Sequence, residues 1–138
     1  MKLYAWVKNG HLFTTEDKNL ASSEAIELEV ETPDDIILDN GQIRLKTEAE
    51  KLAEEKQKKL TELKNYVARL LEQTDYIIVK ISEAQVLGDT NEVERLKQKY
   101  ATQLQQREAI RQWNEQMKQA IRNAQTLEEL RSIEIRYG

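Results

Sequence analysis

Cysteine is absent from this sequence of 138 residues, and proline and histidine occur once each. Without cysteine, neither disulfide bonds nor thiol chemistry contributes, which is consistent with a reducing cytoplasm. With His11 as the single histidine, only a carboxylate-rich site of the calcium type remains among the common metal sites. The acidic turns at residues 32–35 and 39–40 lack the loop spacing of such a site. We therefore expect no metal ion and no cofactor.

Signatures of catalysis and of membrane insertion are missing as well. There is no glycine-rich phosphate loop and no Gly-x-Ser-x-Gly elbow, and His11 follows a predicted turn, where we expect it to be exposed. No window approaches the roughly 18 apolar residues of a membrane span, and residues 1–8 are too short for the apolar region of a signal peptide. The sequence predicts no enzyme, no catalytic residue, no membrane partner and an intracellular location.

Charged side chains are numerous but evenly mixed over most of the chain. Apolar residues make up 39% and charged residues 33%, a balance typical of long helices with one buried stripe. Residues 1–46 hold nine Asp and Glu against five Lys and Arg, whereas residues 47–138 hold equal numbers of each sign. A neutral helical part without a clustered basic face is a poor match for DNA or RNA. We therefore expect no nucleic-acid partner.

The first 46 residues alternate apolar and polar side chains at period two, as β-strands do. Two pairs, Asn9-Gly10 and Asn40-Gly41, stand between alternating runs. They predict β-hairpins, because both central positions of such a turn take positive φ. We expect a small antiparallel sheet of about five strands over residues 1–46.

The rest of the chain predicts a long, coiled-coil-like antiparallel helical hairpin. Thr47 and Glu50 have the spacing of a capping box at the start of a helix. Gly88 stands where a helix C-cap glycine would, and Asp89 supplies an N-cap signal directly after it. So short a turn makes the two arms antiparallel neighbours. The expected apolar seam comprises Leu60, Leu63, Val67, Leu70, Thr74, Ile77, Ile81 and Ala84 on the first arm and Val93, Leu96, Tyr100, Leu104, Ile110, Met117, Ile121 and Ala124 on the second.

One stretch of the first arm has the composition of a strand. Residues 76–81 are mostly β-branched and would suit a buried strand, whereas the unbroken phase of the seam favours a helix. A break near Thr74 and Asp75, with Asp75 capping a new helix, would reconcile the two. A second capping box at residues 126–129 predicts a short final helix.

The fold class that follows is α+β. A β-rich head is expected over residues 1–46, and a helical hairpin that pivots near Gly88 is expected over residues 47–138. The seam closes either within one chain or between chains, because both arrangements use the same residues, and self-association through the arms therefore stays open.

Polar side chains interrupt the seam of the second arm at Gln103, Arg107 and Asn114. A buried arginine or asparagine is costly unless it is paired, and such residues can fix helix register or oligomeric state. Alternatively, the helix rotates and leaves these side chains at the edge of the seam, and the sequence supports both interpretations equally. Trp113 lies beside the seam, and we expect it to pack against the first arm.

A short element of the first arm resembles a known family. The run Leu-Leu-Glu-Gln-Thr-Asp-Tyr at residues 70–76 is similar to the Leu-Leu-x-x-Thr-Asp-aromatic element of small phage tail-fibre assembly proteins, or tail chaperones. In that family a tryptophan and a Gln-Ala-Leu-Arg-like stretch follow on a later helix. Trp113 and Gln-Ala-Ile-Arg at residues 119–122 resemble them, with the spacing displaced by one residue. The family's proline-containing loop and its tail with proline and tryptophan have no counterpart here, and the resemblance covers about residues 36–125.

The resemblance implies a non-enzymatic phage or prophage protein that binds a tail-fibre or baseplate protein. Such a protein would mask an aggregation-prone surface, or hold fibre chains together as they trimerise, in the cytoplasm of the bacterial host. One alternative is a structural adaptor that oligomerises through its helices and stays in the virion. Another is a coiled-coil interaction protein with no link to phage. Tyr4 and Trp6 share a strand face, where they either cover the base of the helices or anchor a partner. The residues expected at the partner interface are Tyr4, Trp6, Tyr76, Arg107, Trp113 and Asn114.

Overall fold

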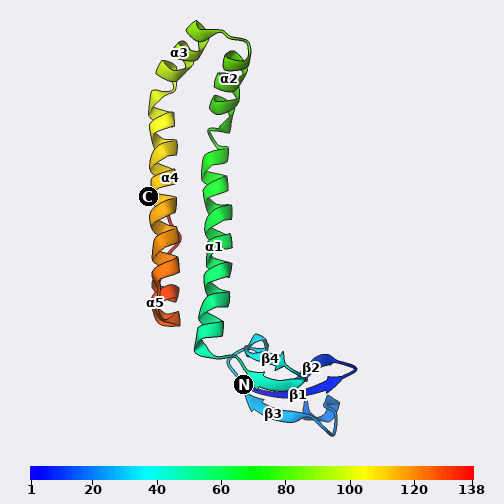
Figure 1. The fold of residues 1–138 in the computed structure, drawn as a ribbon. Helices are drawn as coiled ribbons and strands as arrows, with labels where there is room; N and C mark the ends of the chain where they lie inside the picture. Colours follow the sequence, from blue (N-terminus) through cyan, green and yellow to red (C-terminus); the bar gives the residue numbers. More distant parts are fainter. The chain divides into compact units, whose positions relative to one another are not determined.

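The computed structural model describes residues 1–138 and divides into two units, Met1–Lys51 and Leu52–Gly138 (Figure 1). The first unit is β-rich and the second is helical, so the α+β class is confirmed. The strands are β1 (Lys2–Lys8), β2 (His11–Thr15), β3 (Ile26–Glu29), β4 (Ile36–Asp39) and β5 (Gln42–Leu45). The helices are α1 (Glu48–Glu72), α2 (Asp75–Val86), α3 (Thr90–Lys99), α4 (Ala101–Asn123) and α5 (Leu127–Ser132), with short 3-10 turns at Lys18–Leu20 and Pro33–Asp35.

The five strands belong to two antiparallel sheets rather than to one. The first sheet has the order β2-β1-β3, and β4 pairs only with β5. Both edges of β1 are occupied by β2 and β3, so β4 and β5 pair with each other. The two sheets share one apolar core in which Leu3 and Ala5 from β1 pack with Val30 and Ile36. As expected for Asn-Gly hairpins, both central residues of each turn have positive φ, at residues 9–10 and 40–41.

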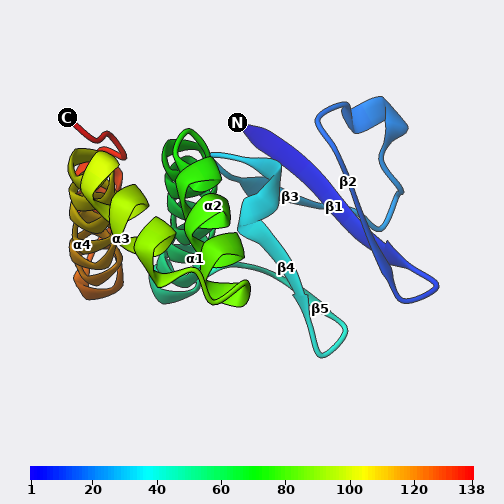
Figure 2. The same cartoon turned by 90° about the horizontal axis from the view of Figure 1, so that it is seen from above.

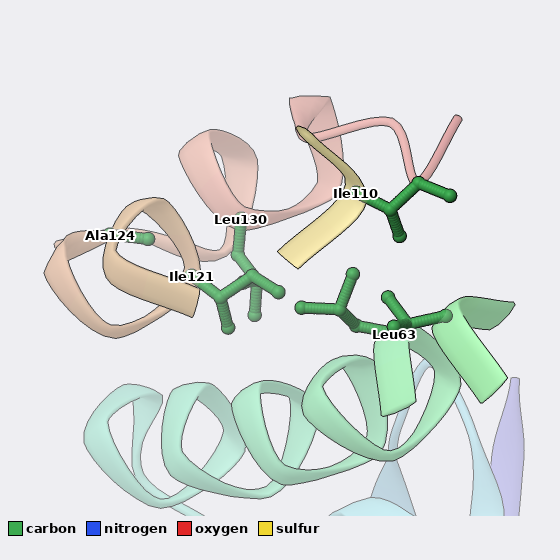
Figure 3. Packing of buried hydrophobic residues seen from close by; sticks show 6 residues of the cluster. Leu63, Ile110, Ile121, Ala124 and Leu130 are labelled. Atoms are coloured by element: carbon green, nitrogen blue, oxygen red, sulfur yellow. The ribbon is translucent and has the colours of Figure 1, made fainter. Parts of the chain in front are cut away.

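The helices of the second unit form an antiparallel hairpin. α1 and α2 run in one direction and α3 and α4 return beside them, as Figures 1 and 2 show. Towards the turn, the residues buried between α2 and α3 are Ile77, Ile81, Ala84, Val93, Leu96 and Tyr100. Further from the turn, Figure 3 shows Leu63 of α1 facing side chains from α4 and α5. The buried residues there are Leu63, Val67, Ile110, Ile121, Ala124 and Leu130. The seam is therefore closed within one chain.

In the turn between the two arms, Asp89 hydrogen-bonds to the end of α2 and to the start of α3. Gly88 has φ +71, and its N–H donates to the carbonyl of Gln85. The N–H of Asp89 reaches back to the carbonyl of Ala84, which completes a Schellman motif at the end of α2. The side chain of Asp89 then accepts a hydrogen bond from the N–H of Glu92 and caps the start of α3. The expected pivot at Gly88 is confirmed.

Each arm contains a break between two helices. The first arm breaks between α1 and α2, as the compromise interpretation expected, and residues 76–81 are helical. Thr74, rather than Asp75, occupies the N-cap position of α2. The second arm breaks at Tyr100, between α3 and α4. No glycine or proline marks this second break, and the sequence did not predict it.

α5 and the tail that follows it fold back along α1. Thr126 caps α5 through a hydrogen bond from the N–H of Glu129, so the expected final helix is confirmed. The Lys59 ammonium donates to the carbonyl of Leu130 at 2.9 Å. Arg131 pairs with Glu55 at 2.8 Å, and its hydrogen bonds lower the pKa of that carboxyl. α5 therefore closes one side of the core formed by α1 and α4.

Candidate functional site

Arg107 of α4 is the one buried charged residue, with 5% of its surface exposed. Its Nη1 atom lies 2.8 Å from the carbonyl oxygen of Leu71, 2.8 Å from Oγ1 of Thr74 and 3.0 Å from Oδ1 of Asp75. Leu71 lies in the last turn of α1, Thr74 is the N-cap residue in the break, and Asp75 is the first residue of α2. The guanidinium thus joins the two helix ends at the break in the first arm.

The charges at this break match the helix dipoles. The Arg107 cation lies at the negative C-terminal end of α1, and the Asp75 carboxylate lies at the positive N-terminal end of α2. Each charge is stabilised by the dipole of that helix. Asp75 is more than half exposed, so its ion pair with Arg107 is partly screened by solvent. Of the two interpretations of the polar seam residues, burial with pairing is confirmed for Arg107. All the partners of its Nη1 atom are groups at the two helix ends, whereas its Nε is buried without a partner.

Asn114, two turns further along α4, is only half-buried. Its Oδ1 atom is buried and accepts no hydrogen bond, and the residue lines a groove between α1 and α4. Gln103 is also half-buried and lies at the edge of the seam. Asn114 and Gln103 therefore fit the interpretation in which polar side chains lie at the edge of the seam, whereas Arg107 does not.

Trp113 packs against the first arm within a cluster of three aromatic side chains. Its ring centroid is 5.8 Å from that of Tyr66 on α1 and 5.3 Å from that of Tyr137 in the tail. The hydroxyl of Tyr66 also accepts a hydrogen bond from the N–H of Tyr137 at 3.0 Å. Trp113 thereby fastens the tail to the hairpin, and its indole is engaged within this chain.

Tyr4 and Trp6 lie on the face of β1 opposite the buried residues Leu3 and Ala5. Trp6 stacks on Phe13 of β2, its cross-strand partner, with 5.8 Å between the ring centroids. Phe13 is exposed, and Tyr4 and Trp6 are half-buried. The sequence analysis did not include Phe13 among the candidate residues. The register of the Asn9-Gly10 hairpin was the signal that would have placed it beside Trp6.

The outer face of α2 carries apolar side chains that belong to none of the buried clusters. Val86 is 86% exposed, Leu87 82% and Val79 55%, and Tyr76 and Ile78 are exposed as well. A shallow hollow of about 460 Å³ lies over this face. We name Tyr76, Ile78, Val79, Val86 and Leu87 the α2 stripe. Of these residues the sequence analysis singled out only Tyr76 as an interface candidate. It considered Ile78 and Val79 only as part of the strand-or-helix question, and it assigned no role to Val86 and Leu87.

Tyr76 joins the α2 stripe to a cluster of aromatic and basic side chains. Its ring meets Tyr100 edge-on at 5.9 Å, and the Lys80 ammonium lies within 6 Å of both rings. Burial opposes ionisation of Tyr100, but Lys80 and Lys99 outweigh it and lower the pKa of the phenol. The six candidate interface residues thus do not form one site. Tyr4 and Trp6 share a face of β1, Trp113 and Asn114 are adjacent in α4, and Tyr76 neighbours Arg107 through Asp75.

The ionisable side chains form no group of three or more His, Cys, Asp or Glu arranged to hold a metal ion. None of the helices is both long and apolar enough to cross a membrane.

The strongest pKa shift in the carboxyl groups is at Glu50, whose pKa is lowered to about 2 by hydrogen bonds from Arg44 and Thr47. Both donors belong to the structure around the start of α1.

Comparison with protein-family models, with curated protein sequences and with solved structures finds no match.

Proposed function

We propose that this chain is a non-enzymatic phage or prophage protein that binds a tail-fibre or baseplate protein during assembly. The likeness of residues 70–76 to the tail-fibre assembly proteins supports the choice of client. The α2 stripe supports the mode of action. A protein that masks an aggregation-prone apolar surface needs an apolar surface of its own, and the neighbouring exposed side chains of the α2 stripe provide one.

The α2 stripe suits a client because it is uncovered while the hairpin is complete. The opposite side of α2 is buried against α3 through Ile77, Ile81 and Ala84. The hairpin therefore presents Val79, Val86 and Leu87 without unfolding. Burying one such side chain fully against a client contributes about 1.5–3 kcal/mol. The stripe is small, which suits a client that must be released when the fibre is complete.

The adaptor alternative uses the same stripe to join copies of the chain. The seam is not free for that purpose, since its buried residues are paired within one chain. A symmetric antiparallel pair of α2 helices would also bring Glu83 of each copy onto the same side of the contact, and like charges at such a position are unfavourable. This carboxylate favours a different protein as the occupant of the stripe.

Co-expression with the candidate fibre protein tests the proposal. The fibre protein is chosen from the long gene beside the one that encodes this chain, and soluble fibre is measured in the lysate together with its co-purification. We expect the fibre to be soluble with the wild-type chain. We expect Val79→Ser with Val86→Ser to weaken fibre binding about a hundredfold, because two such side chains together contribute about 3 kcal/mol.

Leu20→Ser is the matched control, because Leu20 is 72% exposed but lies outside the α2 stripe. It should leave co-purification unchanged. Purified particles separate the two functions: a chaperone is absent from finished virions, and an adaptor is present at a fixed stoichiometry. Fixed stoichiometry in virions, or equal effects of the control and the stripe variant, would overturn the proposal.

A further inference from the structure

A second surface of the helical unit has a different chemistry from the α2 stripe. It is a groove of about 390 Å³ between α1 and α4, with Leu60 and Val67 as its apolar floor. Its walls carry three cations, Lys64, Lys118 and Arg122. The remaining lining residues are Gln57, Thr61 and Asn114.

The groove lies on the side of the hairpin that α5 leaves open. On α1, α5 and the tail contact Glu55, Lys59 and Tyr66. At 3.6 residues per turn, the groove residues at positions 57, 61 and 64 are about half a turn round the helix from those contacts. The buried residue Leu63 lies between the two sides. One side of the core is therefore covered by α5, and the other is covered only by the groove side chains.

The charge of the groove is unbalanced although the helical part as a whole is neutral. None of its lining residues is acidic. Lys118 has one carboxylate neighbour, Glu115, at 3.2 Å on the same exposed face of α4. Asn114 adds a side-chain oxygen that accepts no hydrogen bond. Cations above an apolar floor fit a ligand with alternating carboxylate and apolar side chains.

We propose that this groove binds an acidic peptide segment of a protein partner, distinct from the apolar client surface that the α2 stripe would engage. Carboxylates of the segment pair with Lys64, Lys118 and Arg122, and its apolar side chains lie on Leu60 and Val67. A main-chain N–H of the segment donates to Asn114 once that amide turns outward. The stretch from Gln57 to Val67 is about 15 Å long, which about five extended residues span. A nucleic-acid backbone would leave the apolar floor unused.

Binding of a fluorescein-labelled peptide of alternating glutamate and valine, measured by fluorescence anisotropy on the full chain, tests this site. We expect Lys118→Glu with Arg122→Glu to weaken binding at least tenfold. Raising the salt concentration to about 0.5 M should weaken binding to the wild-type chain as well. A milder variant, Lys64→Gln with Lys118→Gln, should weaken binding less while keeping the fold, as judged by an unchanged circular-dichroism spectrum. Lys58→Glu with Lys97→Glu is the control for net charge, and it should leave affinity within twofold.

Backbone amide shifts on peptide addition should concentrate at residues 57–67 and 114–122. Equal affinity of the control and groove variants, shifts elsewhere, or equally strong competition by oligothymidylate would overturn the assignment of the groove. The variant Val79→Ser with Val86→Ser should still bind the peptide. Loss of fibre binding and loss of peptide binding are thus separate results, and either proposal can fail alone.

Discussion

The side chain of Arg107 shows how one buried charge can settle the geometry of a helical arm. It adds a charged donor at the break between α1 and α2, where the carbonyl of Leu71 already accepts hydrogen bonds from the N–H and the hydroxyl of Thr74. The same nitrogen reaches Thr74 and Asp75. A sliding of α4 by one turn would separate the guanidinium from all three oxygens, so Arg107 selects one register of the two arms.

Replacing Arg107 by methionine tests this role while keeping most of the length of the side chain. We expect Arg107→Met to lower the free energy of unfolding by about 2 kcal/mol. The three lost hydrogen bonds contribute about 1.5–3 kcal/mol each, but the variant also removes the cost of burying a guanidinium whose Nε has no partner. Urea unfolding measures the change. Arg111→Met on the same helix is the control, since Arg111 is exposed and its nearest carboxylate is 3.8 Å away, and it should change the free energy by less than about 0.5 kcal/mol. Equal effects would contradict the register role.

At the scale of single elements, the start of α1 is held by a capping box with an added ion pair. The N–H of Thr47 donates to Glu50 at 2.9 Å, the N–H of Glu50 donates to Oγ1 of Thr47 at 3.2 Å, and Arg44 donates to both carboxylate oxygens. The capping box was predicted from spacing alone. Arg44 was not, because its approach depends on the β4–β5 hairpin that presents it.

A titration of the Glu50 carboxyl carbon by NMR checks this cap. Arg44 and Thr47 hold the pKa of Glu50 at about 2 in the folded chain, below its ordinary value of 4.5. Because the folded pKa is the lower one, the stabilisation is complete above pH 4.5 and is lost as the pH falls towards 2. Glu50→Gln should remove that part of the pH dependence of stability. A titration midpoint near 4.5 would show that the cap is not formed.

The elements differ in how far the sequence determines them. Periodicity and caps predicted the two arms, both hairpins and the turn at Gly88, because each depends on residues close together in the chain. The division of the strands into two sheets and the break at Tyr100 depend on contacts between distant segments, which a local pattern does not contain. The α2 stripe was missed for a related reason: Val79 and Val86 lie outside the expected seam, and only the packing shows that no other segment covers them.

At the scale of the whole molecule, the two units have separate cores. One buried cluster lies within Met1–Lys51, and two others lie within Leu52–Gly138. Each unit holds one of the two tryptophans, Trp6 in the first and Trp113 in the second. The chain therefore carries one natural fluorescent reporter for each core.

Leu130→Ala should separate the stability of the two units. Leu130 is almost fully buried in the core between α1, α4 and α5, and truncation of such a side chain costs about 3 kcal/mol. We expect the unfolding midpoint reported by Trp113 in the Trp6→Phe background to fall. The midpoint reported by Trp6 in the Trp113→Phe background should stay the same.

Val86→Ala is the matched control in the second unit, because Val86 is exposed, and it should move neither midpoint noticeably. A shift of both midpoints by Leu130→Ala would show that the units unfold as one.

Asp89 closes the end of α2 with its N–H and opens α3 with its carboxylate. A single opening of the turn at Gly88 therefore releases both helix ends at once. In amide hydrogen exchange, the last turn of α2 and the first turn of α3 should share one protection factor, and Asp89→Ala should lower it on both sides of the turn equally. The tip of the hairpin would then open and close as one cooperative unit, directly beside the exposed Val86 and Leu87.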